Sequence, residues 1–171
     1  PASASYCQRG IGLLMGAVVL VPSWYAMTAL RAQEQGFALL LMLLLLVWGV
    51  DIGAYAAGKS FGRNKLLPAV SPGTTREGLF GGLSDCVWVG LGFAVWLELS
   101  WLQSVYLLVL SVLTGLVSVL GDLFESMLKR ERGLKDSGKL LPGHGGILDR
   151  IDSLTAAAPV FFAGLSFLYG V

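Results

Sequence analysis

The segment 126–152 gathers residue types that bind phosphate and divalent metal: lysines, arginines, aspartates, glycines and the only histidine of the chain, His144. The whole chain is 55% hydrophobic and only 13% charged, whereas soluble domains are charged at about 25% of their residues. An apolar protein has no packing reason to concentrate charge in one place, so this segment must face water or a polar cavity. We therefore expect it to form the active site of a membrane enzyme.

Aspartates lie at the ends of several apolar runs, at Asp51, Asp122, Asp149 and Asp152. A carboxylate inside a bilayer costs about 2.5–3.5 kcal/mol, so each acid needs a partner. Oxygen-only ligands favour Mg²⁺, and we expect Asp122 and Asp149 to bind one or two such ions, with Asp51 and Asp152 as further candidate ligands. Two simpler roles stay open: Asp152 as a cap or first-turn residue, and Asp149 as the partner of a cation. For Asp85, inside another apolar run, we expect a helix-packing or water-cavity role.

A glycine-rich turn follows Lys135 and precedes Arg150. Its residues Gly145 and Gly146 offer unhindered N–H groups just before a predicted helix, an arrangement that can bind an anion. His144 lies between glycines, so it has little core to support. We interpret it as a group for proton transfer or phosphate contact, with a structural role as the alternative.

A second polar loop lies at residues 71–78 and has the sequence S-P-G-T-T-R-E-G. It offers three hydroxyls and one cation just before an apolar run, and of these we single out Ser71, Thr74 and Arg76. On its own this loop is typical of a turn at the membrane surface. Beside the glycine-rich turn, on the same face, we expect it to form the other wall of a nucleotide site.

Five apolar segments are long enough to cross a bilayer, which requires about 20 residues per helix. We therefore predict an all-α, polytopic membrane helix bundle that forms a single domain over residues 1–171. Most cations fall in two loops, a basic loop at 58–77 and a signature loop at 124–152. The positive-inside rule places both loops in the cytoplasm, while the net charge of +1 gives no indication of nucleic-acid binding. The predicted spans are residues 10–30, 37–57, 79–99, 104–123 and 154–171.

The segment 126–152 resembles the signature of the phosphatidate cytidylyltransferase family, also called CDP-diacylglycerol synthases. That signature reads S, two residues, K-R, four residues, K-D, a short spacer, P-x-H-G-G and finally D-R-x-D. The likeness extends upstream to about residue 48. The matching residues are Ser126, Lys129, Arg130, Lys135, Asp136, Pro142, His144, Gly145, Gly146, Asp149, Arg150 and Asp152.

The resemblance implies transfer of CMP from CTP to phosphatidic acid, with Mg²⁺ as cofactor and pyrophosphate as the second product. It implies an integral protein of the bacterial inner membrane, with its active site on the cytoplasmic face, and a homodimer. By position, Asp122 and Asp149 match the metal ligands of the family. The other catalytic matches are Lys135, His144 and Arg150, and the expected substrate-binding residues are Ser71, Thr74, Arg76, Lys129, Arg130, Gly145 and Gly146.

This chain departs from the family pattern at three positions. Members usually carry Lys at Thr74, an aromatic residue at Arg76, and Thr or Ser at Ile52. They are also longer, with more membrane helices before the matched region. The alternatives are therefore a non-catalytic membrane subunit or a truncated inactive form. Two other classes are less well supported. A CDP-alcohol phosphotransferase would need a D-G-x-x-A-R stretch, which the sequence lacks. A transporter would be expected to show inverted repeats, whereas the polar groups here cluster at one face.

Overall fold

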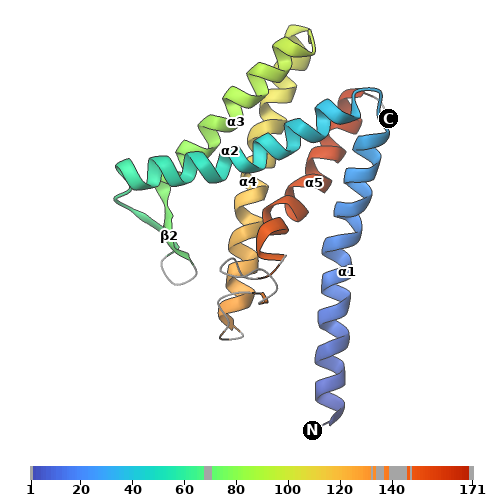
Figure 1. Ribbon diagram of the computed structural model, residues 1–171, viewed down its shortest axis with the longest axis vertical. Coiled ribbons are helices and arrows are strands. Elements are labelled where there is room, and N and C mark those ends of the chain that lie inside the picture. The colour runs from blue at the N-terminus through green and yellow to red at the C-terminus, as the bar shows by residue number, and fades with distance from the viewer. Residues whose placement is uncertain are drawn as a thin grey trace.

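The computed structural model describes residues 2–67, 71–131, 133, 137–138, 146 and 148–169. Side chains are described from residue 14 onward, apart from residues 15, 72, 131, 148, 150 and 169 within these ranges. Five helices and one short hairpin make up this part of the chain (Figure 1). The elements are α1 (Ala2–Ala32), α2 (Gly36–Phe61), β1 (Lys65–Leu67), β2 (Ser71–Thr75), α3 (Arg76–Trp96), α4 (Trp101–Glu131) and α5 (Leu148–Tyr169).

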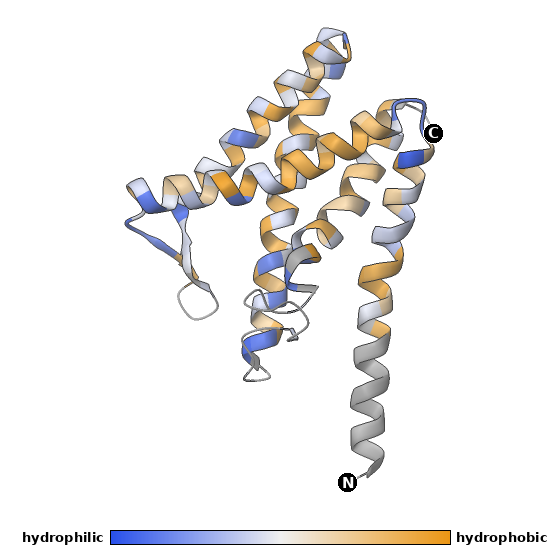
Figure 2. Cartoon of the chain, in the orientation of Figure 1, coloured by the Kyte–Doolittle hydropathy of each residue, from blue (hydrophilic) through white to orange (hydrophobic). Residues whose placement is uncertain are grey.

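The predicted bundle of membrane helices is confirmed. Within the described residues, four helices are long and apolar enough to cross a membrane. The fifth predicted span falls in α1, where side chains are described only from Leu14. Figure 2 shows the apolar residues concentrated in the middle of the helices, with polar residues at the turns and at the lower end of α4. The four spans are Gly36–Phe61, Arg76–Trp96, Trp101–Arg130 and Ile151–Leu168.

The core lies where α2 crosses the other helices. The apolar first half of α2 contributes Met42, Leu43 and Leu46, which are all fully buried, and α5 contributes Phe161. Glycine allows α3 to approach α2 at close range, since a Cβ added to Gly82 would lie 2.6 Å from the carbonyl oxygen of Val50. Such close backbone contact is typical of membrane helices, because lipid offers no hydrophobic force to drive helices together.

The hairpin β1–β2 replaces part of the predicted basic loop at 58–77. Helix α2 continues to Phe61 and α3 begins at Arg76, so the connection is shorter and more regular than the composition suggested. Its two strands are antiparallel, with Lys65 opposite Thr75. Thr75 then caps α3, because its extended backbone lets the side-chain oxygen accept a hydrogen bond of 3.1 Å from the Gly78 N–H.

The ends of the helices alternate as predicted. Figure 1 shows four parts of the chain toward the lower end of the molecule. They are the start of α1, the hairpin, the end of α4 and the start of α5. The turns between α1 and α2 and between α3 and α4 lie at the upper end. Both basic loops therefore belong to one side, and the assignment of that side to the cytoplasm stays a prediction. Helix α4 reaches Glu131, so the first residues of the predicted signature loop are helical.

Candidate active site

Carboxylates from three helices lie within range of one another's charge. The charge of Asp51 on α2 interacts with those of Asp122 on α4 and Asp152 on α5. Asp122 and Asp152 also interact directly, carboxyl against carboxyl. Both are half-buried, whereas Asp51 is exposed. Two neighbouring carboxylates repel each other unless a proton or a cation lies with them, so the cluster is built to hold positive charge.

Close packing of α4 and α5 creates this cluster. A Cβ added to Gly121 would lie 2.6 Å from the Cβ of Ala156 and 3.2 Å from the carbonyl oxygen of Asp152. Only a residue without a side chain allows α5 to come this near to α4. The neighbouring Asp122 is thereby brought beside Asp152.

Lys129 forms the second part of the site, two turns further along α4. Its ammonium group lies 3.1 Å from the Glu125 carboxylate and 2.9 Å from Oδ1 of Asp149. Lys129 thus ties the end of α4 to the start of α5 across a gap of twenty residues. Glu125 also interacts with Asp152, so it links Lys129 to the aspartate cluster.

Asp149 accepts hydrogen bonds from three directions. Oδ1 accepts from Lys129 and from the Ser137 N–H at 3.1 Å, while Oδ2 accepts from the Ser137 N–H at 2.9 Å and the Gly146 N–H at 2.7 Å. Burial opposes ionisation of this carboxyl, but the donors of Gly146, Lys129 and Ser137 outweigh it, so the pKa of Asp149 is held well below its ordinary value. The side chain is therefore an ionised anchor for the segment between α4 and α5.

The contacts and the helix bounds test the two simpler roles that the sequence left open: cation pairing for Asp149 and helix capping for Asp152. Asp149, in the first turn of the helix, does pair with a cation, as the simpler alternative predicted. Asp152 lies in the second turn, so the alternative of a cap or first-turn residue is wrong for it. Asp122 lies beside Asp152. Asp152 in turn follows Asp149 by about one turn of α5. The metal roles of all three stay predictions.

The predicted second wall is the hairpin. The hydroxyls of Ser71 and Thr74 lie 2.7 Å apart, and Arg76 is exposed at the first position of α3. The Glu77 carboxylate accepts hydrogen bonds from the backbone and side-chain N–H groups of Asn64, which fastens the hairpin to α3. The hairpin packs against α2 and α3, so α2 is the element that it shares with the aspartate cluster.

Several predicted residues lie wholly or partly outside the described residues. Lys135, His144 and Gly145 belong to this group, and for Arg150 only the helical backbone is described. Arg130 is exposed in the last turn of α4. The N–H of Gly146 donates to Asp149, so in this arrangement it is not free to bind an anion.

The donor set fits a magnesium ion. Magnesium is usually bound through one or two carboxylates, with phosphate oxygens and water at its other positions. Among the described residues, no three acidic, histidine or cysteine side chains surround one common point. Asp122 and Asp152 form a neighbouring pair of carboxylates, and Asp51 lies within range of their charge, so their metal role stays a prediction.

Two features of the site were not predicted from the sequence. Glu125 follows Asp122 by three residues and precedes Lys129 by four, a spacing that places all three on one face of a helix. The sequence analysis missed this spacing because the predicted helix ended at residue 123, whereas α4 continues to Glu131. The same face carries the hydroxyls of Thr114 and Ser118, which are fully buried and lack a hydrogen-bond partner among the described residues.

Asp85 behaves as expected for a helix-packing residue. Its carboxylate lies against Gly53 of α2, in the space that a side chain at that position would fill, and its Cβ would be 3.6 Å from a Cβ at Gly49. It belongs to the α2–α3 contact and not to the cluster on α2, α4 and α5.

Comparison with known proteins assigns the chain to a family. Residues 2–168 match the sequence model of the Cytidylyltransferase family. A protein from Pseudomonas aeruginosa named phosphatidate cytidylyltransferase is 50% identical over 164 residues, which cover 95% of this chain and 60% of the relative. Proteins of the same name from Haemophilus influenzae and Staphylococcus epidermidis are 43% and 42% identical, over 94% and 76% of this chain and over 60% and 50% of their own lengths. The chain thus spans about 60% of the length of the first two relatives, and it belongs to the Cytidylyltransferase family.

Proposed function

We propose that this chain contains the catalytic part of a phosphatidate cytidylyltransferase, which transfers CMP from CTP to phosphatidic acid. The observation that carries the proposal is the neighbouring pair Asp122 and Asp152 from two membrane helices, with Asp51 of a third within range of their charge, in a chain of this family. The relatives of that name, up to 50% identical, support the same substrates.

The charges of the site match the demands of this reaction. A phosphate oxygen of the lipid attacks the α-phosphorus of CTP in line, and pyrophosphate leaves. Both substrates are anions, so catalysis consists mainly of neutralising charge and aligning the reacting atoms. A cluster of carboxylates alone would repel both substrates, which is why the proposal includes Mg²⁺. When bound by Asp122 and Asp152, a divalent cation would supply the positive charge that the phosphates require.

The chain's own residues then have separate tasks. Lys129 and Asp149 fix the start of α5 against α4, which sets the position of Asp152 one turn further on. The paired hydroxyls of Ser71 and Thr74 offer hydrogen bonds to a nucleotide. Asp51 is exposed, so the cluster is accessible from its side.

The membrane provides the setting for a reaction between a soluble nucleotide and a lipid. Asp122 and Asp152 lie in the halves of α4 and α5 nearest the segment that joins these helices, and both helices are long enough to cross a bilayer. The joined ends of α4 and α5 lie on the same side of the molecule as the hairpin. We place this side in the cytoplasm of a bacterial cell, where CTP is available. Lipid then reaches the site from the inner leaflet without leaving the membrane.

Radiolabelled CTP tests the proposal. Membranes that contain the protein, given phosphatidic acid and Mg²⁺, should convert the label into a lipid-soluble product, and chelation of the metal should stop the conversion. Asp122→Asn should lower the rate at least a hundredfold, whereas Asp85→Asn, a matched change at an aspartate outside the cluster, should keep most of it. Absence of a labelled lipid with well-folded protein would favour a non-catalytic subunit. Equal rates for the two variants would refute the assignment of the cluster.

A further inference from the structure

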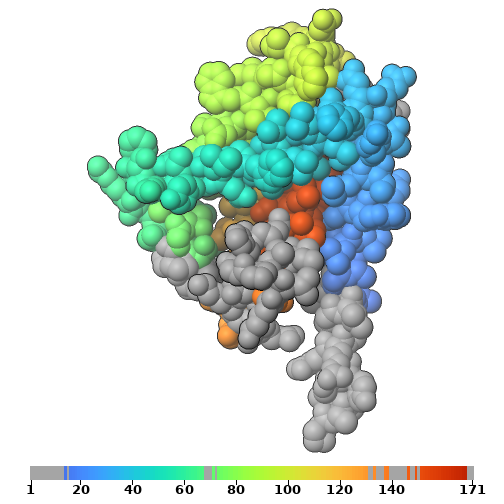
Figure 3. Space-filling view, in the orientation of Figure 1, coloured from blue at the N-terminus to red at the C-terminus, as the bar shows by residue number. Residues whose placement is uncertain are grey.

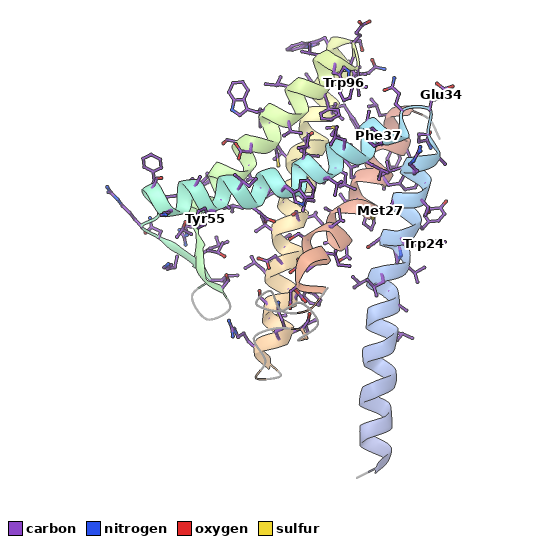
Figure 4. The ribbon with its side chains drawn as sticks, viewed as in Figure 1. Trp24, Met27, Glu34, Phe37, Tyr55 and Trp96 are labelled. Atoms are coloured by element: carbon purple, nitrogen blue, oxygen red, sulfur yellow. The ribbon has the colours of Figure 1, made fainter. Side chains whose placement is uncertain are left out.

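The end of α2 and the adjoining hairpin carry an exposed mixture of apolar and cationic side chains. Tyr55, Phe61 and Leu67 are 68%, 72% and 45% exposed. Lys59, Arg63 and Lys65 are exposed between them. We call these six residues the α2–hairpin patch. In Figure 4 Tyr55 lies near the end of α2 that leads into the hairpin, and Trp96 lies far from it, at the last residue of α3.

The cations of this patch are not neutralised within the described part of the chain. The ion pairs found there all belong to Lys129. The nearby acid Glu77 is occupied by hydrogen bonds from Asn64. Lys59 instead lies over the Tyr55 ring, 5.6 Å from its centre, and is exposed at the surface. The patch therefore presents net positive charge beside exposed aromatic rings.

The patch lies at the end of α2 that leads into the hairpin, on the side of both basic loops. Helix α2 has 26 residues, which gives a length of about 39 Å, and it runs across α1 and α4 in Figure 1. Figures 1 and 3 show this end of α2 and the hairpin projecting sideways from the rest of the molecule, so lipid can surround them.

Aromatic rings favour the boundary between acyl chains and headgroups, and lysine and arginine next to them attract anionic lipids. We propose that the α2–hairpin patch binds anionic phospholipid headgroups of the membrane layer on its own side. The site would concentrate lipids with a negatively charged phosphate beside the bundle. It does not depend on catalytic activity, since charge and exposure alone recognise the headgroup.

Lipid retention by the purified protein tests this proposal. The protein is extracted from vesicles of equal parts phosphatidylglycerol and phosphatidylcholine, and retained lipids are counted by native mass spectrometry. Each cation should contribute about a fivefold preference for the anionic lipid. The combined variant Lys59→Gln, Arg63→Gln, Lys65→Gln should therefore retain at least tenfold less phosphatidylglycerol. The matched control Arg31→Gln, an exposed cation at the opposite end of the bundle, should retain it fully.

Two results would overturn the proposal. One is equal retention of phosphatidylglycerol by the combined variant and the control. The other is unchanged lipid retention together with weaker binding of CTP, which would make the patch part of a nucleotide site. Should the combined variant fail to fold, a salt titration of the unmodified protein decides, because preference for the anionic lipid must fall as ionic strength screens the cations. A preference that salt leaves unchanged would also overturn it.

Discussion

Replacing Asp149 by asparagine should loosen the segment between α4 and α5. The carboxylate accepts four hydrogen bonds from Lys129, Ser137 and Gly146, with two on each oxygen. Asparagine has one carbonyl oxygen, and its amide nitrogen would face an N–H or an ammonium group. In either orientation at least one charge-assisted bond is lost and a donor meets a donor.

The size of the effect follows from the burial of these groups. The Asp149 side chain is 8% exposed and that of Lys129 is 16% exposed, so water compensates little for a lost bond. One lost bond to a charged group costs about 1.5–3 kcal/mol, and the bonds that remain are weaker without the negative charge. We expect a local destabilisation of about 2–4 kcal/mol, which corresponds to an about 30- to 700-fold larger equilibrium constant for local opening of the segment.

Hydrogen exchange of the backbone N–H groups measures this directly. In Asp149→Asn, the Gly146 and Ser137 amides should exchange faster by that factor, while amides in the centre of α2 should not change. Asp85→Asn is the matched control, because it removes the same charge outside this network. Unchanged exchange at Gly146 and Ser137 in the Asp149 variant would refute the role of Asp149 as an anchor.

Two further changes test the packing of α3. Gly82→Ala should lower the free energy of unfolding in detergent by about 1–3 kcal/mol, because the new Cβ meets the backbone of Val50. The control Gly92→Ala, where a Cβ would have nothing within 4 Å, should be neutral or stabilising. Equal effects of the two changes would contradict the close contact between α2 and α3. Thr75→Ala removes the cap of α3 and should cost about 1 kcal/mol, while Thr75→Ser keeps the hydroxyl and should cost less. A larger loss for Thr75→Ser than for Thr75→Ala would show that the cap contributes nothing.

The sequence predicted the helices well because hydropathy depends on composition alone. It also predicted that aspartates from separate helices bind a metal together, and that stays a prediction. It could not predict the contact between Lys129 and Asp149, since that pair depends on how closely α5 packs on α4 at Gly121. The hairpin was missed for a related reason. Its strands are only three and five residues long, and the Glu77 contacts that hold it to α3 come from a residue that the sequence placed in the loop.

Asp122 and Asp149 should respond in opposite directions to the same substitution, although the sequence predicted both as metal ligands. Asp149 is surrounded by donors, so loss of its charge removes attraction. Asp122 faces Asp152, so Asp122→Asn removes repulsion between half-buried carboxyls and should stabilise the metal-free protein by about 1 kcal/mol or more. Added Mg²⁺ should raise the unfolding temperature of the unmodified protein and have little effect on this variant, because only a ligand bound to the folded state stabilises it. A destabilised Asp122→Asn protein that still responds to Mg²⁺ would mean that Asp122 is a packing residue and that the cation binds elsewhere.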